Sequence, residues 1–326
     1  MKAYVCRRYG GLEVLELAEV EKPTPKGKEV LVKIFATTVT AGDWRVRTLE
    51  VPKGLGLIAR LALGVTRPRQ PILGTELSGV IEAVGKAVTR FAPGDAVLAF
   101  PGGKMGCHAQ YRAVAEDGAI ALKPDNLTFE DAACLSFGGS TALHYLRKAE
   151  IRPGEKVLVI GASGGVGTAL VQLAKHFGAH VTGVTSTANI DLVASLGAER
   201  VIDYKKHDFT DGGETYDVIA DTVGSTPLSR CKRALADKGR FLAIAGDLSA
   251  MLAAVWAPLT SNTRVIAGPA EERPEDVAQL ADLARTGVLK PVIDRRYDFA
   301  QMAEAHAYVE TRRKRGSVVV RVERDE

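Results

Sequence analysis

The chain has 326 residues, of which 46% are hydrophobic and 25% are charged, a composition typical of a globular protein with one large or two medium domains. Its 43 basic and 39 acidic residues give a formal net charge of +4, which is too small and too dispersed to favour nucleic acid or an anionic membrane as a partner. The 4 cysteines are scattered singly, which indicates free thiols in a reducing compartment rather than a disulfide scaffold.

Short apolar runs bounded by glycine or proline turns fill the chain up to about residue 122. The opening residues, MKAYVCRRYGG, lack the apolar stretch of a secretory signal and predict a first strand, so we expect a cytoplasmic protein. Runs such as EVLVKIFATTV (29–39) and LSGVIEAVG (77–85) predict further strands. The most apolar windows are well short of the roughly 20 residues that span a bilayer. A strand-rich domain without a transmembrane segment is therefore predicted here.

Strands alternate with helices from about residue 123 onward. The stretch EDAACLSFGGSTALHYLRKA (130–149) has helical periodicity. Five buried strand runs then follow, separated by helical stretches: KVLVI (156–160), HVTGVT (180–185), RVIDY (200–204), YDVIADTV (216–223) and RFLAIAG (240–246). This alternation predicts a parallel, doubly wound sheet. Near the end of the chain, two helical stretches precede SVVVRV (317–322), a strand that we expect to pair with the first domain.

A glycine-rich corner follows the first of these runs, in VLVIGASGGVG (157–167). It joins a strand to a helical pattern that ends near Gly178, a residue suited to a C-terminal cap. Gly164 and Gly167 occupy the second and third glycine positions of a G-x-G-x-x-G fingerprint, and Ala162 replaces the first. The middle glycine lets the backbone approach a pyrophosphate, and the helix N-terminus supplies free N–H groups and partial positive charge. The corner therefore predicts a dinucleotide site.

The same corner also matches G-x-S-x-G, the nucleophile elbow of a hydrolase, with Ser163 as the nucleophile. That alternative requires an acid and a histidine later in the chain. His176 and His180 flank the end of the helix that starts at the corner, while His207 and His306 lie in a polar loop and within a helix. We therefore favour the dinucleotide hypothesis and keep the hydrolase as an alternative.

The residues after HVTGV indicate which dinucleotide is bound. An NAD site usually has Asp or Glu about 20 residues past the glycines, to bind the ribose 2′-hydroxyl. Thr185, Ser186 and Thr187 stand there instead, and their hydroxyls can donate to a 2′-phosphate. The sequence therefore predicts NADP(H), although the same residues could simply cap the next helix.

With these residues in view, the whole chain resembles the medium-chain dehydrogenase/reductase superfamily, in its zinc-independent, quinone-oxidoreductase-like branch. The motifs that carry the resemblance are, in order, MKAYV, ATTVTAGDWRVR, ILGTELSGVIEAVG, FAPGDAV, CHAQYRAV, GGSTAL, GASGGVG, GAERVIDY and RGSVVV. The resemblance implies an α/β fold in which a GroES-like, β-rich catalytic domain (1–123 and 268–326) surrounds a Rossmann domain with a doubly wound parallel sheet (124–267). It also implies a substrate cleft between the domains and a homodimer.

The resemblance also bears on zinc. Zinc alcohol dehydrogenases of this superfamily carry Gly-His-Glu where this chain has GTE (74–76), and a cysteine where it has TAG (40–42). Cys107 and His108 are adjacent but lack further ligands at a suitable spacing. We therefore predict no metal site.

Carried over from the resemblance, the expected cofactor contacts lie on both domains. They are Thr40, Thr141, Ala162, Ser163, Gly164, Gly165, Val166, Gly167, Thr185, Ser186, Tyr204, Val223, Ala245 and Gly246. Arg315, in the basic stretch TRRKRG (311–316), is an alternative contact for a cofactor phosphate, although cations at a helix end also complement its dipole.

The catalytic cleft is expected to hold Thr40 near the nicotinamide, with Trp44 and Arg47 on its wall. Two apolar windows, 55–63 and 250–259, are expected to extend that wall and to favour an apolar substrate. Trp44 could instead belong to the core, and the second window could pack a dimer.

The predicted reaction follows from the lack of zinc ligands. Without a metal, an isolated ketone loses the Lewis acid that usually polarises it. A quinone or an enone spreads the charge that hydride addition creates, so a few hydrogen-bond donors can stabilise it. We therefore hypothesise an NADPH-dependent oxidoreductase that reduces a small apolar quinone or α,β-unsaturated carbonyl compound. The alternatives are a zinc-independent alcohol or carbonyl dehydrogenase of the same superfamily and a non-catalytic NADPH-binding sensor or structural protein.

Overall fold

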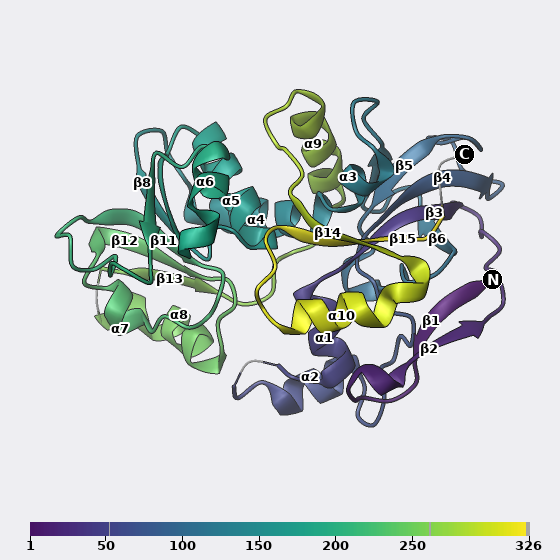
Figure 1. Cartoon of the computed structure of the whole chain (residues 1–326), viewed down its shortest axis with the longest axis horizontal. Helices are drawn as coiled ribbons and strands as arrows, with labels where there is room; N and C mark the ends of the chain where they lie inside the picture. Colours follow the sequence, from purple (N-terminus) through teal and green to yellow (C-terminus); the bar gives the residue numbers. More distant parts are fainter. Residues whose placement is uncertain (52, 261, 324–326) are drawn as a thin grey trace.

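Two large β-sheets lie side by side in the computed structural model, which describes residues 1–51, 53–260 and 262–323 (Figure 1). The seven-stranded sheet has the order β14-β15-β3-β4-β5-β7, with β6 also paired to β3. Its strands are β3 (Glu29–Val39), β4 (Leu77–Val84), β5 (Ala96–Ala99), β6 (Tyr111–Ala115), β7 (Ile120–Leu122), β14 (Ile293–Asp298) and β15 (Ser317–Arg321). β1 (Lys2–Cys6) and β2 (Leu15–Glu19) form a separate antiparallel pair.

β3 is the 11-residue strand around which the seven-stranded sheet is built. One of its edges pairs with β4, and the other pairs with β6 along its first half and with β15 along its second half. Val30, Val32 and Ile34 alternate along it and are fully buried, as expected where one face of a strand covers a core. Since β15 comes from the end of the chain, the prediction that SVVVRV pairs with the first domain is confirmed.

The six-stranded sheet is parallel throughout, as predicted, and has the order β10-β9-β8-β11-β12-β13. Its strands are β8 (Lys156–Ile160), β9 (His180–Thr185), β10 (Arg200–Asp203), β11 (Tyr216–Asp221), β12 (Leu235–Ala243) and β13 (Arg264–Ala267). The chain winds outward from β8 to β10 and then returns to wind the other way from β11 to β13. A ligand crevice is expected at the carboxyl ends of β8 and β11, where the winding reverses.

Helices cover both faces of the six-stranded sheet and fill the junction with the other sheet (Figure 1). In chain order, the helices of the described residues are α1 (Ala41–Thr48), α2 (Gly56–Leu63), α3 (Phe129–Ala133), α4 (Ser136–Ala149), α5 (Gly165–His176), α6 (Ile190–Ser195), α7 (Leu228–Cys231), α8 (Leu248–Thr260), α9 (Pro274–Arg285) and α10 (Met302–Glu310). Val157 and Val159 of β8 face the core under α4, α5 and α9, whereas Leu158 and Ile160 face the core on the side of α7 and α8. All four are apolar because the strand is buried on both faces.

The helix predicted over residues 130–149 is two helices, α3 and α4, because the chain turns at Cys134 and Leu135. The turn places the start of α4 against Glu76, whose carboxylate accepts a hydrogen bond from Phe137 N (2.7 Å). A long-range contact with the other sheet therefore accompanies the break, which local periodicity did not indicate.

Glycines permit the closest backbone contacts around the turn between β8 and α5. A Cβ on Gly167 would lie 2.1 Å from the carbonyl oxygen of Gly161, so α5 can pack against the end of β8 only without a side chain there. A Cβ on Gly138 of α4 would lie 2.4 Å from the carbonyl oxygen of Gly165. Both helices consequently reach the turn at backbone contact.

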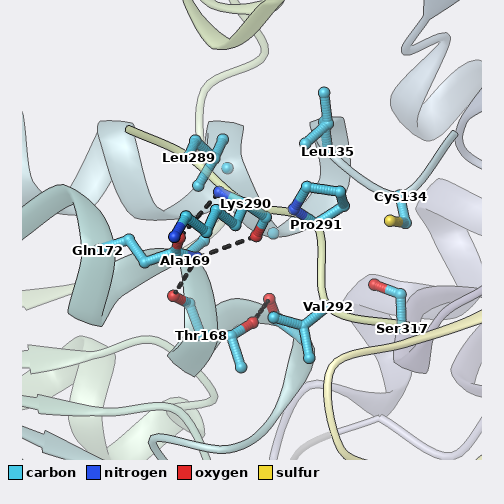
Figure 2. A pocket seen from close by; sticks show the side chains of 13 residues that line it. Cys134, Leu135, Thr168, Ala169, Gln172, Leu289, Lys290, Pro291, Val292 and Ser317 are labelled. Atoms are coloured by element: carbon cyan, nitrogen blue, oxygen red, sulfur yellow. Dashed lines mark hydrogen bonds between the residues drawn. The ribbon is translucent and has the colours of Figure 1, made fainter. Parts of the chain in front are cut away.

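The two sheets are also joined by a buried amide. Gln172 of α5 donates to the carbonyl oxygen of Lys290 (3.1 Å) and accepts from Lys290 N (2.8 Å), beside a small pocket that Figure 2 shows. Its Nε2 also donates to Thr168 O (3.1 Å). These bonds fasten α5 to the segment that leads into β14. Among the described residues, no helix has the length and apolarity needed to cross a bilayer.

We expect Gly167→Ala to destabilise the fold and Gly164→Ala to leave its stability unchanged. A methyl group at 167 would strike the Gly161 carbonyl and should lower the free energy of unfolding by about 2 kcal/mol, after the helix-propensity gain. A methyl group at 164 would lie in ordinary contact, 3.5 Å from the same oxygen. Urea denaturation of both variants measures the difference, and equal stability would contradict this account of the packing.

Candidate functional site

The turn between β8 and α5 presents unpaired N–H groups. Gly164 precedes the helix in extended conformation with no side-chain cap, and the first hydrogen bond of α5 runs from Thr168 N to Gly164 O (2.9 Å). The N–H groups of Val166 and Gly167 lie in the first turn of α5, have no acceptor within the helix and are at the positive end of its dipole, whereas Gly164 and Gly316 form an isolated parallel bridge. A helix N-terminus of this kind fits the pyrophosphate of a dinucleotide.

A lysine from the end of the chain lies against this turn. Gly316 N donates to Ser163 O (2.8 Å), and Lys314 Nζ donates to Gly316 O (2.6 Å). The ammonium lies 2.8 Å from the point that a Cβ on Gly165 would occupy. Desolvation lowers the pKa of Lys314 to about 8, against the opposing attraction of Glu76. The sequence does not single out Lys314, because it stands among three other basic residues, Arg312, Arg313 and Arg315.

Arg315, the residue expected to contact a cofactor phosphate, has a different environment. It is exposed, its backbone N donates to Asp294 Oδ2 (2.8 Å), and its guanidinium pairs with Asp294 Oδ1 (3.4 Å). Its neighbour Lys314 is thus the cation that the structure brings to the fingerprint turn. Adjacent residues of this segment therefore face different ways: Lys314 lies against the turn, and Arg315 pairs with Asp294.

Among the hydroxyls predicted at the end of β9, that of Thr185 bonds directly to Ser163. Ser163 Oγ accepts hydrogen bonds from Thr185 Oγ1 (2.8 Å) and Asn189 Nδ2 (3.1 Å), and Asn189 also donates to Ser186 Oγ (3.3 Å). In the part of the chain that the structure describes, no histidine or carboxylate bonds to this serine. The geometry therefore does not support the hydrolase alternative, which requires a base within hydrogen-bond reach.

The end of β10 adds charges beside these hydroxyls. Parallel pairing sets Asp203 next to Thr185, and Asp203 accepts from Thr187 Oγ1 (2.6 Å) and from Lys205 N (3.0 Å). The Thr187 hydroxyl, with the neighbouring lysines, lowers the pKa of Asp203. Lys205 and Lys206 are exposed there and supply the cations absent from the β9 loop itself. The stretch DYKK (203–206) carries this signal in the sequence, but only strand pairing brings it to the hydroxyls. Tyr204, a predicted contact, is also exposed.

The loops after β11 and β12 hold the remaining predicted contacts of the Rossmann part. Asp221 accepts from Val223 N (2.8 Å), Gly224 N (3.0 Å) and Thr226 N (3.2 Å), although burial raises its pKa. A Cβ on Gly224 would lie 2.5 Å from Ala245 O, so the two loops touch. Beside them lies a cavity of about 240 Å³, whose lining includes Gly246 and the first turn of α8. Val223 is exposed at this edge of the sheet.

Thr141 lies one turn beyond the start of α4. Its Oγ1 donates to Phe137 O (2.8 Å) within the helix, and the side chain is half-buried. Because Gly138 brings α4 against Gly165, the structure places Thr141 on a helix that touches the fingerprint turn.

Thr40 is the N-cap of α1 rather than a free hydroxyl. Its Oγ1 donates to Asp43 Oδ2 (2.6 Å) and accepts from Gly42 N (3.2 Å) and Asp43 N (3.3 Å). Asp43 also accepts from Gly74 N (2.8 Å), so it ties α1 to the loop before β4. The Thr40 proton is committed to a buried carboxylate, and the hydroxyl is therefore not available to donate to a substrate in this arrangement.

The structure corrects the placement of Trp44 and Arg47 on a cleft wall. Trp44 is buried in the core beneath α10, with the Arg312 guanidinium 4.7 Å from its ring centroid. Arg47 is 0% exposed, pairs with Glu310 of α10 and donates to Gly10 O (3.1 Å). Neither side chain faces a surface that a substrate could reach, because α1 turns both toward α10. We assign them structural roles.

Glu76 is a buried carboxylate between the two sheets. It accepts from Thr38 Oγ1 (2.6 Å) on one side and from Phe137 N on the other, so it spans from β3 to α4. Burial raises its pKa to about 7, against the effect of these donors. Sequence reasoning singled out this position only as the neighbour of Thr75.

The side chains at the family's zinc position do not fit a metal. Thr75 stands in place of histidine, and its Oγ1 is buried without a hydrogen-bond partner. Cys107 is fully buried, which raises the pKa of its thiol, and His108 Nε2 bonds to Thr38 O (3.0 Å). Within the described ranges, no three His, Cys, Asp or Glu side chains gather closely enough to bind a metal ion.

Comparison with known proteins shows which families and solved structures the chain is similar to. Residues 26–125 match the model of the alcohol dehydrogenase GroES-like domain, and residues 196–320 match that of the zinc-binding dehydrogenase. The chain is 34% identical to the 2-methylene-furan-3-one reductase of Solanum lycopersicum and 33% identical to the NADPH-dependent alkenal/one oxidoreductase of Arabidopsis thaliana, each over 98% of this chain and 79% of the relative. The quinone oxidoreductase structure from Coxiella burnetii superposes with a TM-score of 0.86 at 27% identity, over 99% of both chains.

We expect Arg47→Met to lower stability without changing turnover of the folded protein. Methionine keeps the apolar stem but leaves the Glu310 carboxylate unpaired, which should cost about 3 kcal/mol of unfolding free energy. Arg285→Met, which breaks an exposed pair with Asp282, is the matched control and should cost about 1 kcal/mol or less. Urea denaturation and steady-state kinetics measure both quantities. A fully stable Arg47→Met variant that has lost turnover would restore the catalytic role predicted from the sequence.

Proposed function

This chain belongs to the medium-chain dehydrogenase/reductase superfamily, in its quinone-oxidoreductase-like branch, and on that premise we propose that it reduces a quinone or an α,β-unsaturated carbonyl compound with NADPH. The observation that carries the proposal is the fingerprint turn, where the N–H groups of Val166 and Gly167 begin α5 and the Lys314 ammonium lies against Gly165. Bound there, a nicotinamide dinucleotide supplies hydride. The homodimer, the cytoplasmic location and the domain boundaries at 123 and 268 stay predictions.

The preference for NADP(H) is supported by the ends of β9 and β10. In our proposal, Ser186 donates to the 2′-phosphate, while Lys205 and Lys206 neutralise its charge. The carboxylate of Asp203 does not oppose this, because Thr187 Oγ1 and Lys205 N already occupy its oxygens. Tyr204 is exposed next to these lysines and offers a ring on which the adenine can stack.

The chemistry of the substrate is inferred from what the site can stabilise. The described residues offer no metal-binding set, so the oxygen that gains charge must be stabilised by hydrogen bonds or water. Conjugated acceptors meet this condition, since hydride addition to their carbon leaves a negative charge that is delocalised over carbon and oxygen. The chain's own contribution is then to position the reactants and exclude water.

We expect the purified protein to oxidise NADPH in the presence of quinones and enones, and much more slowly with saturated ketones. NADPH should be preferred over NADH because of the cations after β10. Ser163→Ala removes only two neutral hydrogen bonds and should keep the rate within about fivefold. Absorbance at the nicotinamide band during turnover measures all three.

Other outcomes of that assay would contradict the proposal. Tight NADPH binding without turnover on any acceptor would indicate a sensor, and comparable turnover of saturated ketones would indicate a carbonyl dehydrogenase. Ester hydrolysis that disappears in Ser163→Ala would indicate the hydrolase.

We expect the affinity for NADPH to fall as the pH rises through about 8, where Lys314 loses its proton. A phosphate binds the ammonium form, so the dissociation constant should increase by up to about tenfold per pH unit above the pKa of the free protein. Lys314→Met should bind weakly at every pH, and Lys314→Arg should bind well even at about pH 9.5, because a guanidinium stays charged. Fluorescence titration measures the affinities.

The exposed lysine Lys232, at the end of α7, provides the matched control. Lys232→Met should show the same affinities and the same pH dependence as the unaltered chain. If Lys314→Met also kept the pH dependence, Lys314 would not be the titrating group and its proposed contact with the cofactor would be wrong.

A further inference from the structure

Helix α2 is apolar, yet it buries none of its residues. Seven of the eight residues in GLIARLAL (56–63) are uncharged, and no residue of the helix is buried. Leu57 is 73% exposed, Ile58 is 60% exposed and Leu61 is 59% exposed. An apolar helix face in a folded chain normally packs against another element, so the exposure of these three side chains indicates a missing partner.

The charged residues of the segment that contains α2 all have one sign. Residues 51–71 contain four cations and no acidic residue; the cations are Lys53, Arg60, Arg67 and Arg69. Among the described residues, none of the four takes part in a salt bridge, although 17 such bridges occur elsewhere. Arg60 Nη1 donates to Val65 O (2.7 Å) and Arg69 Nη2 donates to Leu61 O (2.7 Å). Both guanidinium groups are thereby held close to the end of the apolar helix.

The start of α8 touches the loop before α2 and extends its apolar surface. Leu248 N donates to Lys53 O (3.2 Å), and a Cβ on Gly54 would lie 2.8 Å from the Leu248 side chain. Leu252, Val255 and Trp256 of α8 are each more than half exposed. Figure 1 shows both helices at the lower edge of the molecule. Each sheet thus contributes one apolar helix to this edge, which we call the α2–α8 surface.

The charge of the α2–α8 surface distinguishes between its possible partners. In a two-fold contact with a second copy, the four cations of each chain would face those of the other, and the segment 51–71 contains no carboxylate to compensate them. An anionic lipid surface complements the cations, and leucine, isoleucine and tryptophan side chains enter the boundary between headgroups and acyl chains. We propose that the α2–α8 surface binds the interface of an anionic lipid bilayer, with α2 lying in its plane.

The net charge of the whole chain does not decide whether this surface binds lipid, because a bilayer responds to local charge. The formal net charge of +4 averages over 326 residues, but a bilayer acts only on charges within about one Debye length of its surface, roughly 8 Å. The four cations of residues 51–71 have no nearby acidic residue in that segment to cancel them. This inference rests on surface chemistry alone and does not depend on the reductase activity.

Co-sedimentation of the full chain with vesicles tests the proposal. Vesicles of phosphatidylcholine with one third phosphatidylglycerol should bind the protein, vesicles of phosphatidylcholine alone should bind it poorly, and about 0.5 M salt should release it. The double variants Leu57→Ser/Ile58→Ser and Lys53→Glu/Arg67→Glu should each lower the partition coefficient by at least about tenfold.

Matched double variants elsewhere on the surface control for polarity and charge. Leu17→Ser/Leu122→Ser alters two other exposed leucines, and Lys26→Glu/Lys86→Glu alters two other exposed lysines. Both should bind vesicles like the unaltered chain, and circular dichroism verifies that all variants fold. The proposal is overturned by absence of binding to anionic vesicles, by equal losses in the control variants, or by a dimer that Leu57→Ser/Ile58→Ser dissociates, which would identify a second copy as the partner.

Discussion

The structure depends on backbone contact at the turn between β8 and α5. Gly167 lets α5 reach the end of β8, Gly138 lets α4 reach the turn from the side, and Gly316 donates to Ser163 from the segment before β15. A side chain at either of the first two positions would overlap a carbonyl oxygen. These contacts bring residues of both sheets together at the carboxyl end of β8, where the winding of the parallel sheet reverses and a ligand crevice is expected.

Charge is distributed unevenly around that point. The N-terminus of α5 is positive and the Lys314 ammonium lies against Gly165 in its first turn, whereas Glu76 and Asp43 are hydrogen-bonded to backbone N–H groups and threonine hydroxyls. The buried carboxylates therefore hold α1, α4 and β3 in place, and in our proposal the positive groups bind phosphate. Burial acts on both kinds of group, since it raises the pKa of Glu76 and lowers that of Lys314.

The exposed apolar edge contrasts with this closed interior. Elsewhere the apolar residues of the helices pack into six buried clusters, but α2 contributes no buried residue to any of them. Arginine side chains of the same segment fold back onto its carbonyl groups instead of reaching acidic partners. The sequence shows this window to be apolar and predicts that it forms part of a cleft wall, which stays a prediction. Hydropathy by itself does not distinguish a buried face from an exposed one.

The sequence by itself determined the features that depend on neighbours along the chain. The order of strands and helices, the parallel sheet and the fingerprint turn all follow from local periodicity and glycine spacing. Only the tertiary structure decided which charged side chains meet, because those contacts join distant positions. It buried Arg47 against Glu310, 263 residues away, and set Lys314 rather than Arg315 against the turn. Which way a side chain faces depends on the packing of other elements, and one sequence carries no direct record of that packing.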